Sequence, residues 1–221
     1  MAHVRRLLLA LLLLGASAPA AAGQSAVLLD VPLHRQAHAL SCEAAALQMA
    51  LATIGIQVTE DDLLQQLARD GTPRTVQPDG SVIWGDPDVG FVGNWDGAFG
   101  VDGYGVYERP IADLAKAQGA AGSVPERRVD PADLYQAVRE GAPVVVWMPY
   151  AGEVHGRGSW ITPAGAEVDY VVTEHAVVLA GLDDNGVTFA DPYTATLQRM
   201  RYDQFEAALA ELGNRAVIVR P

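Results

Sequence analysis

The chain has 221 residues, of which 50% are apolar and 19% are charged, so it can bury a substantial core and is not disordered by composition. Its 15 Lys and Arg residues are outnumbered by 27 Asp and Glu residues, which gives a formal net charge of −12. Nucleic acids and anionic membrane surfaces select basic proteins, so no nucleic-acid partner is expected. The single cysteine, Cys42, excludes an intramolecular disulfide framework.

Residues 1–22 have the pattern of a secretory signal peptide. Arg5 and Arg6 precede the apolar run Leu7–Leu14, and small residues follow as far as Ala22. The run is shorter than the roughly 20 residues that cross a bilayer. We therefore expect a mature domain over residues 23–221 that is secreted or periplasmic, is monomeric and has no membrane span. A retained N-terminal anchor is the alternative, since no charge follows Arg6 within this stretch.

The first half of the mature chain predicts mainly helices. Residues 27–31 form a short apolar strand that stops at Pro32. A helix follows between Ser41, a good N-cap, and Gly55, a good stop, and it is apolar nearly all round, which marks a buried central helix. A second helix is predicted to start at a capping box at Thr59 and to end at residue 68. Two more are predicted, one over residues 110–118 and one from Asp130-Pro131 to Gly141.

The second half predicts mainly strands. Apolar and β-branched runs indicate strands over residues 143–148, 168–182, 187–191, 196–200 and 216–219, with a helix over residues 203–212. The turn Asp183-Asp184-Asn185-Gly186 joins two of these strands as a hairpin. Helices early and strands late predict an α+β domain with two lobes.

Residues 84–107 combine seven glycines with interleaved aromatic residues, and this density of glycine excludes a helix. Aromatic side chains on an adaptable backbone suit a wall that holds a substrate chain, for which the candidates are Trp84, Phe91, Trp95 and Tyr104. The alternative is a loop that packs its aromatic residues on the core. A calcium loop is disfavoured because glycines occupy positions that need oxygen ligands.

Cys42 lies in the first turn of the predicted central helix, where the helix dipole and free N–H groups favour the thiolate over the thiol. A cysteine nucleophile needs this placement, although an isolated cysteine is more often a small buried apolar residue. Gln36, six residues upstream, lies where its amide can turn toward the same point. Together with the backbone N–H of Cys42, that amide would form an oxyanion hole.

His175 lies within an apolar strand, where a histidine is more often a core residue than a functional one. Asp191 lies sixteen residues further on, at the end of the returning strand. A reversal at the predicted hairpin places the two residues on adjacent strands within one or two pairs of each other. An aspartate that accepts from one imidazole nitrogen fixes the tautomer and leaves the other nitrogen to act on a thiol. The sequence does not determine the strand register.

A zinc site is a competing interpretation, because His34, His38 and Cys42 are spaced by four residues. Ser41, however, caps only the helix that follows it, so the three residues would not share one helix. No metal ion or cofactor is therefore expected.

The pattern of Gln36, Ser41-Cys42-Glu43, Glu174-His175 and Asp191-Pro192 resembles the papain-like cysteine peptidases. It is most similar to the bacteriocin-processing (double-glycine-leader) peptidases and their stand-alone secreted relatives. The resemblance implies a helical lobe with the cysteine helix packed against an antiparallel β-sheet lobe. It also implies that Cys42 is the nucleophile, His175 the general base and acid, Asp191 the orienting residue and Gln36 the oxyanion donor.

These roles predict a secreted thiol peptidase that hydrolyses a peptide or protein substrate through a thioester acyl-enzyme. Two alternatives stay open, an acyl- or peptidyl-transferase that uses the same thiol and an inactive peptide-binding relative. The chain lacks the transmembrane and ATP-binding segments of an exporter, so cleavage after a double-glycine leader does not follow from the resemblance.

Overall fold

The computed structural model describes residues 26–221, so the predicted signal peptide lies outside the described residues. Within residues 26–221, none of the helices combines the length and the apolar character that a membrane crossing requires. The helices are α1 (Cys42–Thr53), α2 (Glu60–Gln66), α3 (Glu108–Ala117), α4 (Pro131–Arg139), the short 3-10 helix η1 (Tyr150–Gly152) and α5 (Tyr202–Ala210).

The strands form one large sheet and two small ones. The seven-stranded sheet has the order β12-β11-β10-β7-β13-β6, and β1 pairs with β10 beside this path. Its strands are β1 (Val27–Leu28), β6 (Val124–Glu126), β7 (Val144–Pro149), β10 (Glu174–Asp183), β11 (Gly186–Asp191), β12 (Thr196–Met200) and β13 (Ala216–Ile218). The smaller sheets use β2 (Arg69–Asp70) with β5 (Phe91–Val92), and β3 (Thr75–Val76), β4 (Val82–Ile83), β8 (Arg157–Ile161) and β9 (Glu167–Val171).

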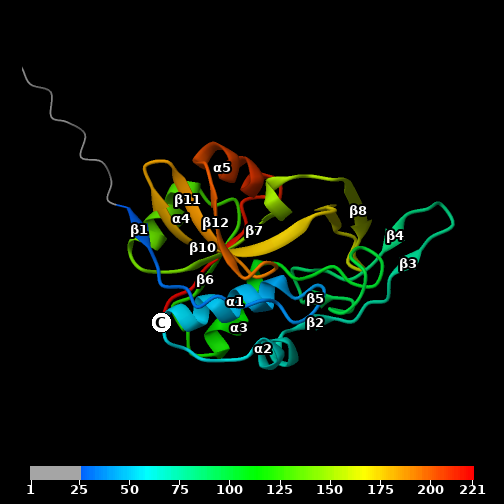
Figure 1. Ribbon diagram of the computed structural model, residues 1–221. Helices are drawn as coiled ribbons and strands as arrows, with labels where there is room; N and C mark the ends of the chain where they lie inside the picture. The colour runs from blue at the N-terminus through cyan, green and yellow to red at the C-terminus, as the bar shows by residue number, and fades with distance from the viewer. Residues whose placement is uncertain (1–25) are drawn as a thin grey trace, which may run out of the picture.

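Helices cover both faces of the large sheet (Figure 1). Along β7 the side chains alternate, so that Val145 and Trp147 pack into one core cluster with α1 and α3. Val144, Val146 and Met148 pack into a second cluster with α4 and α5. The predicted α+β fold is confirmed, with the apolar α1 buried against the centre of the sheet.

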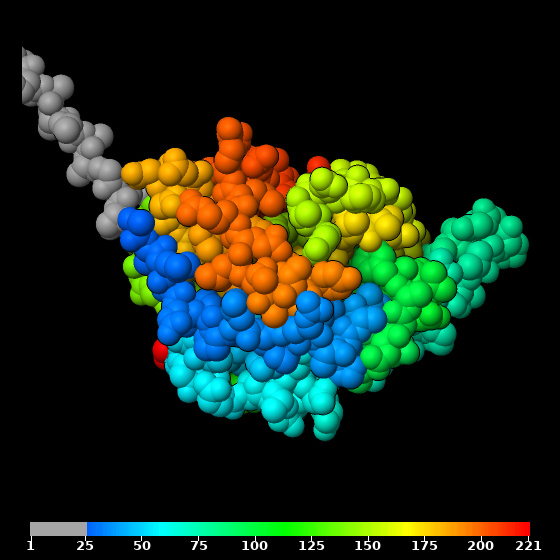
Figure 2. Space-filling model, viewed as in Figure 1, coloured from blue at the N-terminus to red at the C-terminus, as the bar shows by residue number. Residues whose placement is uncertain are grey.

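The prediction of a single strand over residues 168–182 is wrong. The run over residues 168–182 is two strands, β9 and β10, which belong to different sheets and are separated by a turn at Val172 and Thr173. Val172 is 45% exposed, so the apolar run is not buried at this point. The hairpin β3–β4 extends the small outer sheet away from the body of the molecule (Figures 1 and 2).

The predicted hairpin between β10 and β11 is confirmed. The two strands are antiparallel, with Asp183 opposite Gly186 and Val178 opposite Ala190, and an irregularity in register between Leu179 and Gly181. This pairing brings the end of β11 beside the start of β10. This register therefore places Asp191 close to His175.

Candidate active site

A pocket of about 290 Å³ brings together residues that are far apart in the sequence. It is lined by Gln36, Ala39, Leu40, Cys42, Phe99, Tyr104, Tyr150, Val172, Thr173, Glu174, His175 and Tyr193. The backbone N–H of Gln36 donates to the carbonyl oxygen of Pro192 at 2.9 Å, which ties the segment before α1 to the segment after β11. In Figure 2 the blue part of the surface lies against the orange part.

His175 is held by Asp191 at the inner end of the pocket. The imidazole Nε2 lies 2.8 Å from Asp191 Oδ1, and both residues are buried. Because Asp191 engages Nε2, the nitrogen that can exchange a proton with a thiol is Nδ1. The ring of Tyr150 packs edge-on against His175, with 5.5 Å between the ring centres, and restricts the orientation of the imidazole.

Both carboxylate oxygens of Asp191 accept hydrogen bonds. Oδ1 also accepts from the backbone N–H of Tyr193 at 2.8 Å, and Oδ2 accepts from Thr194 Oγ1 at 3.0 Å and Gln198 Nε2 at 2.6 Å. Burial acts to raise the pKa of Asp191, but the hydrogen bond and charge of His175 and the donors of Tyr193 and Thr194 together lower it. Asp191 is therefore an ionised carboxylate at neutral pH.

Cys42 is the first residue of α1, as predicted, but its thiol is not poised as a thiolate. The thiol lies 3.5 Å from Glu43 Oε2 and donates to it, and the residue is 7% exposed. Burial raises the pKa of Cys42 well above its ordinary value, and the charges of Glu43 and Glu174 raise it further, while the backbone N–H of Ala176 acts in the opposite direction. The helix terminus that favours the thiolate is outweighed by burial and by the adjacent carboxyl groups.

Gln36 lies at the pocket, but its amide is engaged by the backbone. Nε2 donates to the carbonyl oxygens of His38 at 2.9 Å and Ala39 at 3.1 Å. Within residues 26–221, Gln36 Oε1 has no hydrogen-bond partner although it is buried. The structure thus brings Gln36 and Cys42 to one pocket without directing the amide N–H groups of Gln36 to a position above the thiol.

The prediction that four aromatic residues form a substrate-binding wall is wrong for three of them. Trp84 and Phe91 are 2% and 1% exposed, and neither they nor Trp95 line the pocket at Cys42. Trp84 packs on Trp160 with 5.4 Å between ring centres, and Phe91 packs on Trp95 at 5.9 Å. Glycines let these rings turn inward onto the core, so the self-packed alternative describes them. Tyr104 does line the pocket.

The competing zinc set is not assembled. His34 Nε2 lies 2.6 Å from Glu60, and both ring nitrogens of His38 face carboxylates, those of Asp96 and Asp61. Among the described residues, the group whose donor atoms are spaced closely enough to hold a metal ion is Cys42, Glu43 and Glu174. Two members of that group, Cys42 and Glu174, line the pocket, and the group contains neither histidine of the predicted zinc set.

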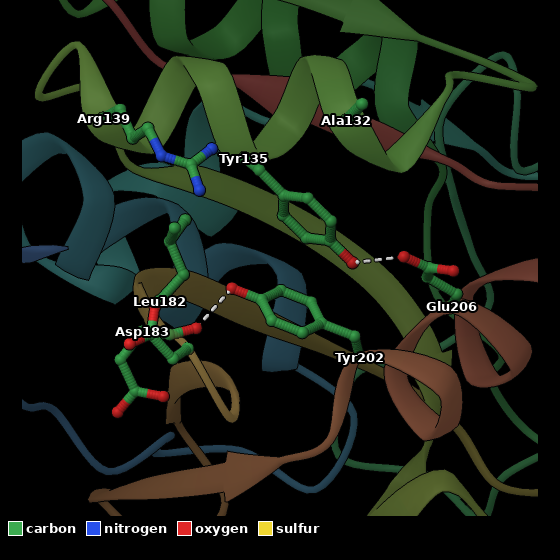
Figure 3. Close-up of a pocket in the computed structure, with 8 residues that line it drawn as sticks. Ala132, Tyr135, Arg139, Leu182, Asp183, Tyr202 and Glu206 are labelled. Atoms are coloured by element: carbon green, nitrogen blue, oxygen red, sulfur yellow. Dashed lines mark hydrogen bonds between the residues drawn. The ribbon is translucent and has the colours of Figure 1, made fainter. Parts of the chain in front are cut away.

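A larger pocket of about 430 Å³ lies against the β10–β11 hairpin and α4. Figure 3 shows Tyr135 and Tyr202 in this pocket, donating to Glu206 and to the carbonyl oxygen of Asp183. Its lining contains neither a thiol nor an imidazole, so it offers no nucleophile with an adjacent base. The smaller pocket at Cys42 is the better candidate for chemistry.

Several residues at the site were given no role in the sequence-based interpretation. Glu43 and Glu174 are charged residues inside an otherwise apolar helix and an apolar strand, and a charge in such a run is a signal of a buried polar role. Tyr150, Tyr193 and Gln198 carry no comparable signal, because their neighbours along the chain do not indicate that they will meet His175 and Asp191.

The fold and this pocket define a papain-like peptidase architecture, and the comparisons with known proteins agree. Residues 28–217 match the model of the Peptidase_C39 like family. The chain therefore belongs to this family, and membership supports a cysteine peptidase in general.

Three similar proteins differ in their sequence identity and structural similarity to this chain. The uncharacterized protein YvpB of Bacillus subtilis is 34% identical over 201 residues, which are 89% of this chain and 77% of that protein. A crystal structure of a Bacillus anthracis protein assigned to the C39-like peptidases has a TM-score of 0.76 at 29% identity, covering 90% of this chain and 98% of that one. The peptidase domain of Streptococcus ComA, a bifunctional ABC transporter, has a TM-score of 0.48 at 16% identity, covering 86% of this chain and 97% of that domain.

Proposed function

We propose that this protein is a secreted thiol peptidase that cleaves peptide bonds with Cys42, His175 and Asp191. The observation that carries the proposal is the 2.8 Å contact between His175 Nε2 and Asp191, which orients the imidazole in the pocket that Cys42 also lines. A buried imidazole oriented by an ionised carboxylate, in the same pocket as the single thiol of the chain, is the set of groups that acyl transfer requires.

The mechanism begins with proton transfer from the Cys42 thiol to His175 Nδ1, for which the thiol leaves Glu43 and turns toward the imidazole. The thiolate attacks the peptide carbonyl carbon, and the oxyanion is held by the backbone N–H of Cys42 and by Gln36 after its amide turns from the carbonyls of His38 and Ala39. His175 then gives its proton to the amine as the C–N bond breaks and the thioester remains. Water, deprotonated by His175, attacks the thioester and releases the acid and the thiol.

The pocket wall suggests what part of a substrate is held. Phe99, Leu40 and Tyr104 supply apolar surface, and Tyr150 and Tyr193 stand at the rim with their rings 5.4 Å apart. Tyr193 is 55% exposed, so its ring is free to contact a ligand. We propose that an extended peptide places one apolar side chain in this pocket beside the scissile bond.

A digest of a peptide library by the wild type and by Cys42→Ala in parallel tests the proposal. The wild type is expected to produce defined cleavages that Cys42→Ala does not, while both proteins unfold at the same temperature because the thiol is a small group. Cleavage by Cys42→Ala at the rate of the wild type would refute the assignment of the nucleophile. The intact mass of the secreted protein tests export, with removal of residues 1–22 as the expected result.

A peptide-binding relative without turnover is the second candidate, because the thiol donates to Glu43 in a conformation that does not favour attack. The same digest separates the two functions. Peptides captured by wild type and Cys42→Ala alike, with no cleavage by either, would indicate a binding protein.

A further inference from the structure

Glu43 and Glu174 are two buried carboxyl groups directly next to the two reacting residues. Glu43 follows Cys42 on α1 and is 1% exposed, whereas Glu174 precedes His175 on β10 and is 8% exposed. One donor atom from each of Cys42, Glu43 and Glu174 lies within 4.8 Å of the others. The side chains thus meet in the layer between α1 and the large sheet.

The surroundings of this pair supply few partners for two negative charges. Glu43 Oε1 accepts from the backbone N–H of Val106 at 2.7 Å, and Oε2 faces the Cys42 thiol. Glu174 Oε1 is buried and has no hydrogen-bond partner within the described part of the chain. A Cβ added to Gly105 would lie 2.2 Å from Glu43 Oε1, so the backbone at this position closes tightly over the pair.

Other titratable groups reach the pair from three directions. Cys42 faces it from α1, while Tyr104 and Tyr107 face it from the glycine-rich segment. Arg215 acts on Glu174 through its charge, but it makes its ion pairs with Asp88 and Glu108 instead. Burial raises the pKa of Glu43 to about 7. Burial and the charge of Glu43 raise the pKa of Glu174 well above its ordinary value.

We propose that Glu43 and Glu174 are positioning residues that hold one proton between them, join the helix of Cys42 to the strand of His175, and set the direction and charge of the thiol. Two buried carboxylates this close, without a paired cation, are strongly unfavourable. One shared proton removes a charge and gives one carboxyl group an O–H to donate. Glu43 then remains able to accept from the thiol, which is the contact that the structure shows.

The shared proton changes the negative charge of the carboxyl pair, and this charge affects the pH at which the Cys42 thiol deprotonates. With the proton in place, the pair carries at most one negative charge beside Cys42. When it is lost, a second charge opposes formation of the thiolate, so Cys42 deprotonates at higher pH. This inference rests on the proposed function for its meaning in catalysis, but the protonation itself does not depend on turnover.

Glutamine at either position tests the proposal, because a carboxamide keeps the shape and provides a permanent N–H donor. The experiment compares wild type, Glu43→Gln and Glu174→Gln with the control Glu167→Gln, which removes an exposed carboxylate on β9. Stability is measured from pH 4.5 to 9 by denaturant unfolding. The Cys42 alkylation rate with iodoacetamide is measured from pH 7 to 11, because the raised pKa of the thiol places its midpoint above the ordinary range, and the lone cysteine makes the assignment direct.

The expected result follows from the sign of the linkage. A carboxyl group whose pKa is raised by folding stabilises the protein fully below the ordinary value of about 4.3, and this contribution is lost as pH rises through about 7. Relative to each glutamine variant, the unfolding equilibrium constant of the wild type should therefore rise about tenfold per pH unit between pH 5 and 6.5. The alkylation midpoint should fall by about one pH unit in both variants and stay unchanged in Glu167→Gln.

A wild type whose stability depends on pH as the glutamine variants do would show that the pair holds no proton, and would overturn the proposal. An unchanged alkylation midpoint would show that the pair does not act on the thiol, and would overturn it equally. Neither readout requires substrate cleavage. A failed peptide digest together with the expected pH effects would refute the proposed function alone.

Discussion

Two buried acidic groups flank the candidate active site, and their surroundings differ sharply. Asp191 accepts from His175, from the backbone N–H of Tyr193 and from two side chains, so each of its oxygens has donors and its pKa is lowered. Among residues 26–221, one buried oxygen of Glu174 has no hydrogen-bond partner. Glu174 also has a carboxyl neighbour, and its pKa is raised. Burial is common to both residues. The number of donors and the sign of the neighbouring charge therefore decide which group is ionised.

The largest expected effect comes from removing the imidazole that contacts Asp191. His175→Ala removes the general base and acid, so kcat/KM on a cleaved peptide should fall by at least about a thousandfold. His155→Ala is the control, since the side chain of His155 is 61% exposed and lies outside the pocket. A His175→Ala protein with more than a tenth of wild-type activity would exclude His175 as the base.

Asp191→Asn removes the negative charge of the carboxylate that accepts these hydrogen bonds and keeps the shape of the side chain. We expect kcat to fall by less than it does in His175→Ala, because the imidazole keeps a hydrogen-bonding neighbour and loses only the charge that orients it. The lowered pKa of Asp191 contributes stability above its ordinary value of about 3.9, and this is lost as pH falls through the lower folded value. Unfolding measured from pH 2 to 5 should show a shallower acid transition in Asp191→Asn. An identical acid transition would contradict the assigned charge.

Tyr193→Ala changes the rim of the pocket without touching either carboxyl group. Its ring is exposed and stands beside Tyr150, so its loss should raise KM severalfold for peptides with an apolar side chain and leave kcat within about twofold. Leu197→Ala is a matched control, since Leu197 is 43% exposed and does not line the pocket. Equal KM values for the two variants would remove Tyr193 from the substrate surface.

The smallest expected effect concerns His38, which bridges Asp61 and Asp96 at 2.9 and 2.7 Å near the start of α1. Hydrogen bonds from these carboxylates raise the pKa of His38. Its stabilising contribution is complete below about pH 6.5 and is lost as pH rises through the raised value. Because the site is largely exposed, the melting temperature should fall by at most about 2 °C relative to His38→Gln between pH 6 and 9. A larger fall in His38→Gln than in the wild type would contradict this sign.

The sequence predicted the central elements because their signals are local. The apolar helix after Ser41, the Asn185-Gly186 turn and the apolar run of β7 each depend on neighbouring residues, and the structure confirms all three. The pairing of His175 with Asp191 followed from one hairpin whose turn was recognisable.

Other features depend on contacts across the fold, which no local pattern contains. The inward packing of Trp84 depends on Trp160, which lies on β8 and is distant in the sequence. The raised pKa of Cys42 comes first from burial in the folded chain, and then from the charges of Glu43 and of Glu174, which is more than a hundred residues away in sequence. Whether a helix terminus or a buried carboxyl group controls the thiol is therefore settled only by tertiary structure.

The turn at Val172 and Thr173 joins strands of two different sheets, and the carbonyl oxygen of Thr173 accepts from the backbone N–H of Tyr150 at 2.6 Å. Successive residues of a strand point to opposite faces, so Glu174 and His175 owe their separate surroundings to the register of β10, which pairs Glu174 with Pro149 and His175 with Met148 of β7. A one-residue insertion here would have to be absorbed by the outer sheet. Otherwise the imidazole and the carboxyl side chain would exchange places, and a change of chain length by one residue would erase the site without altering any of its members.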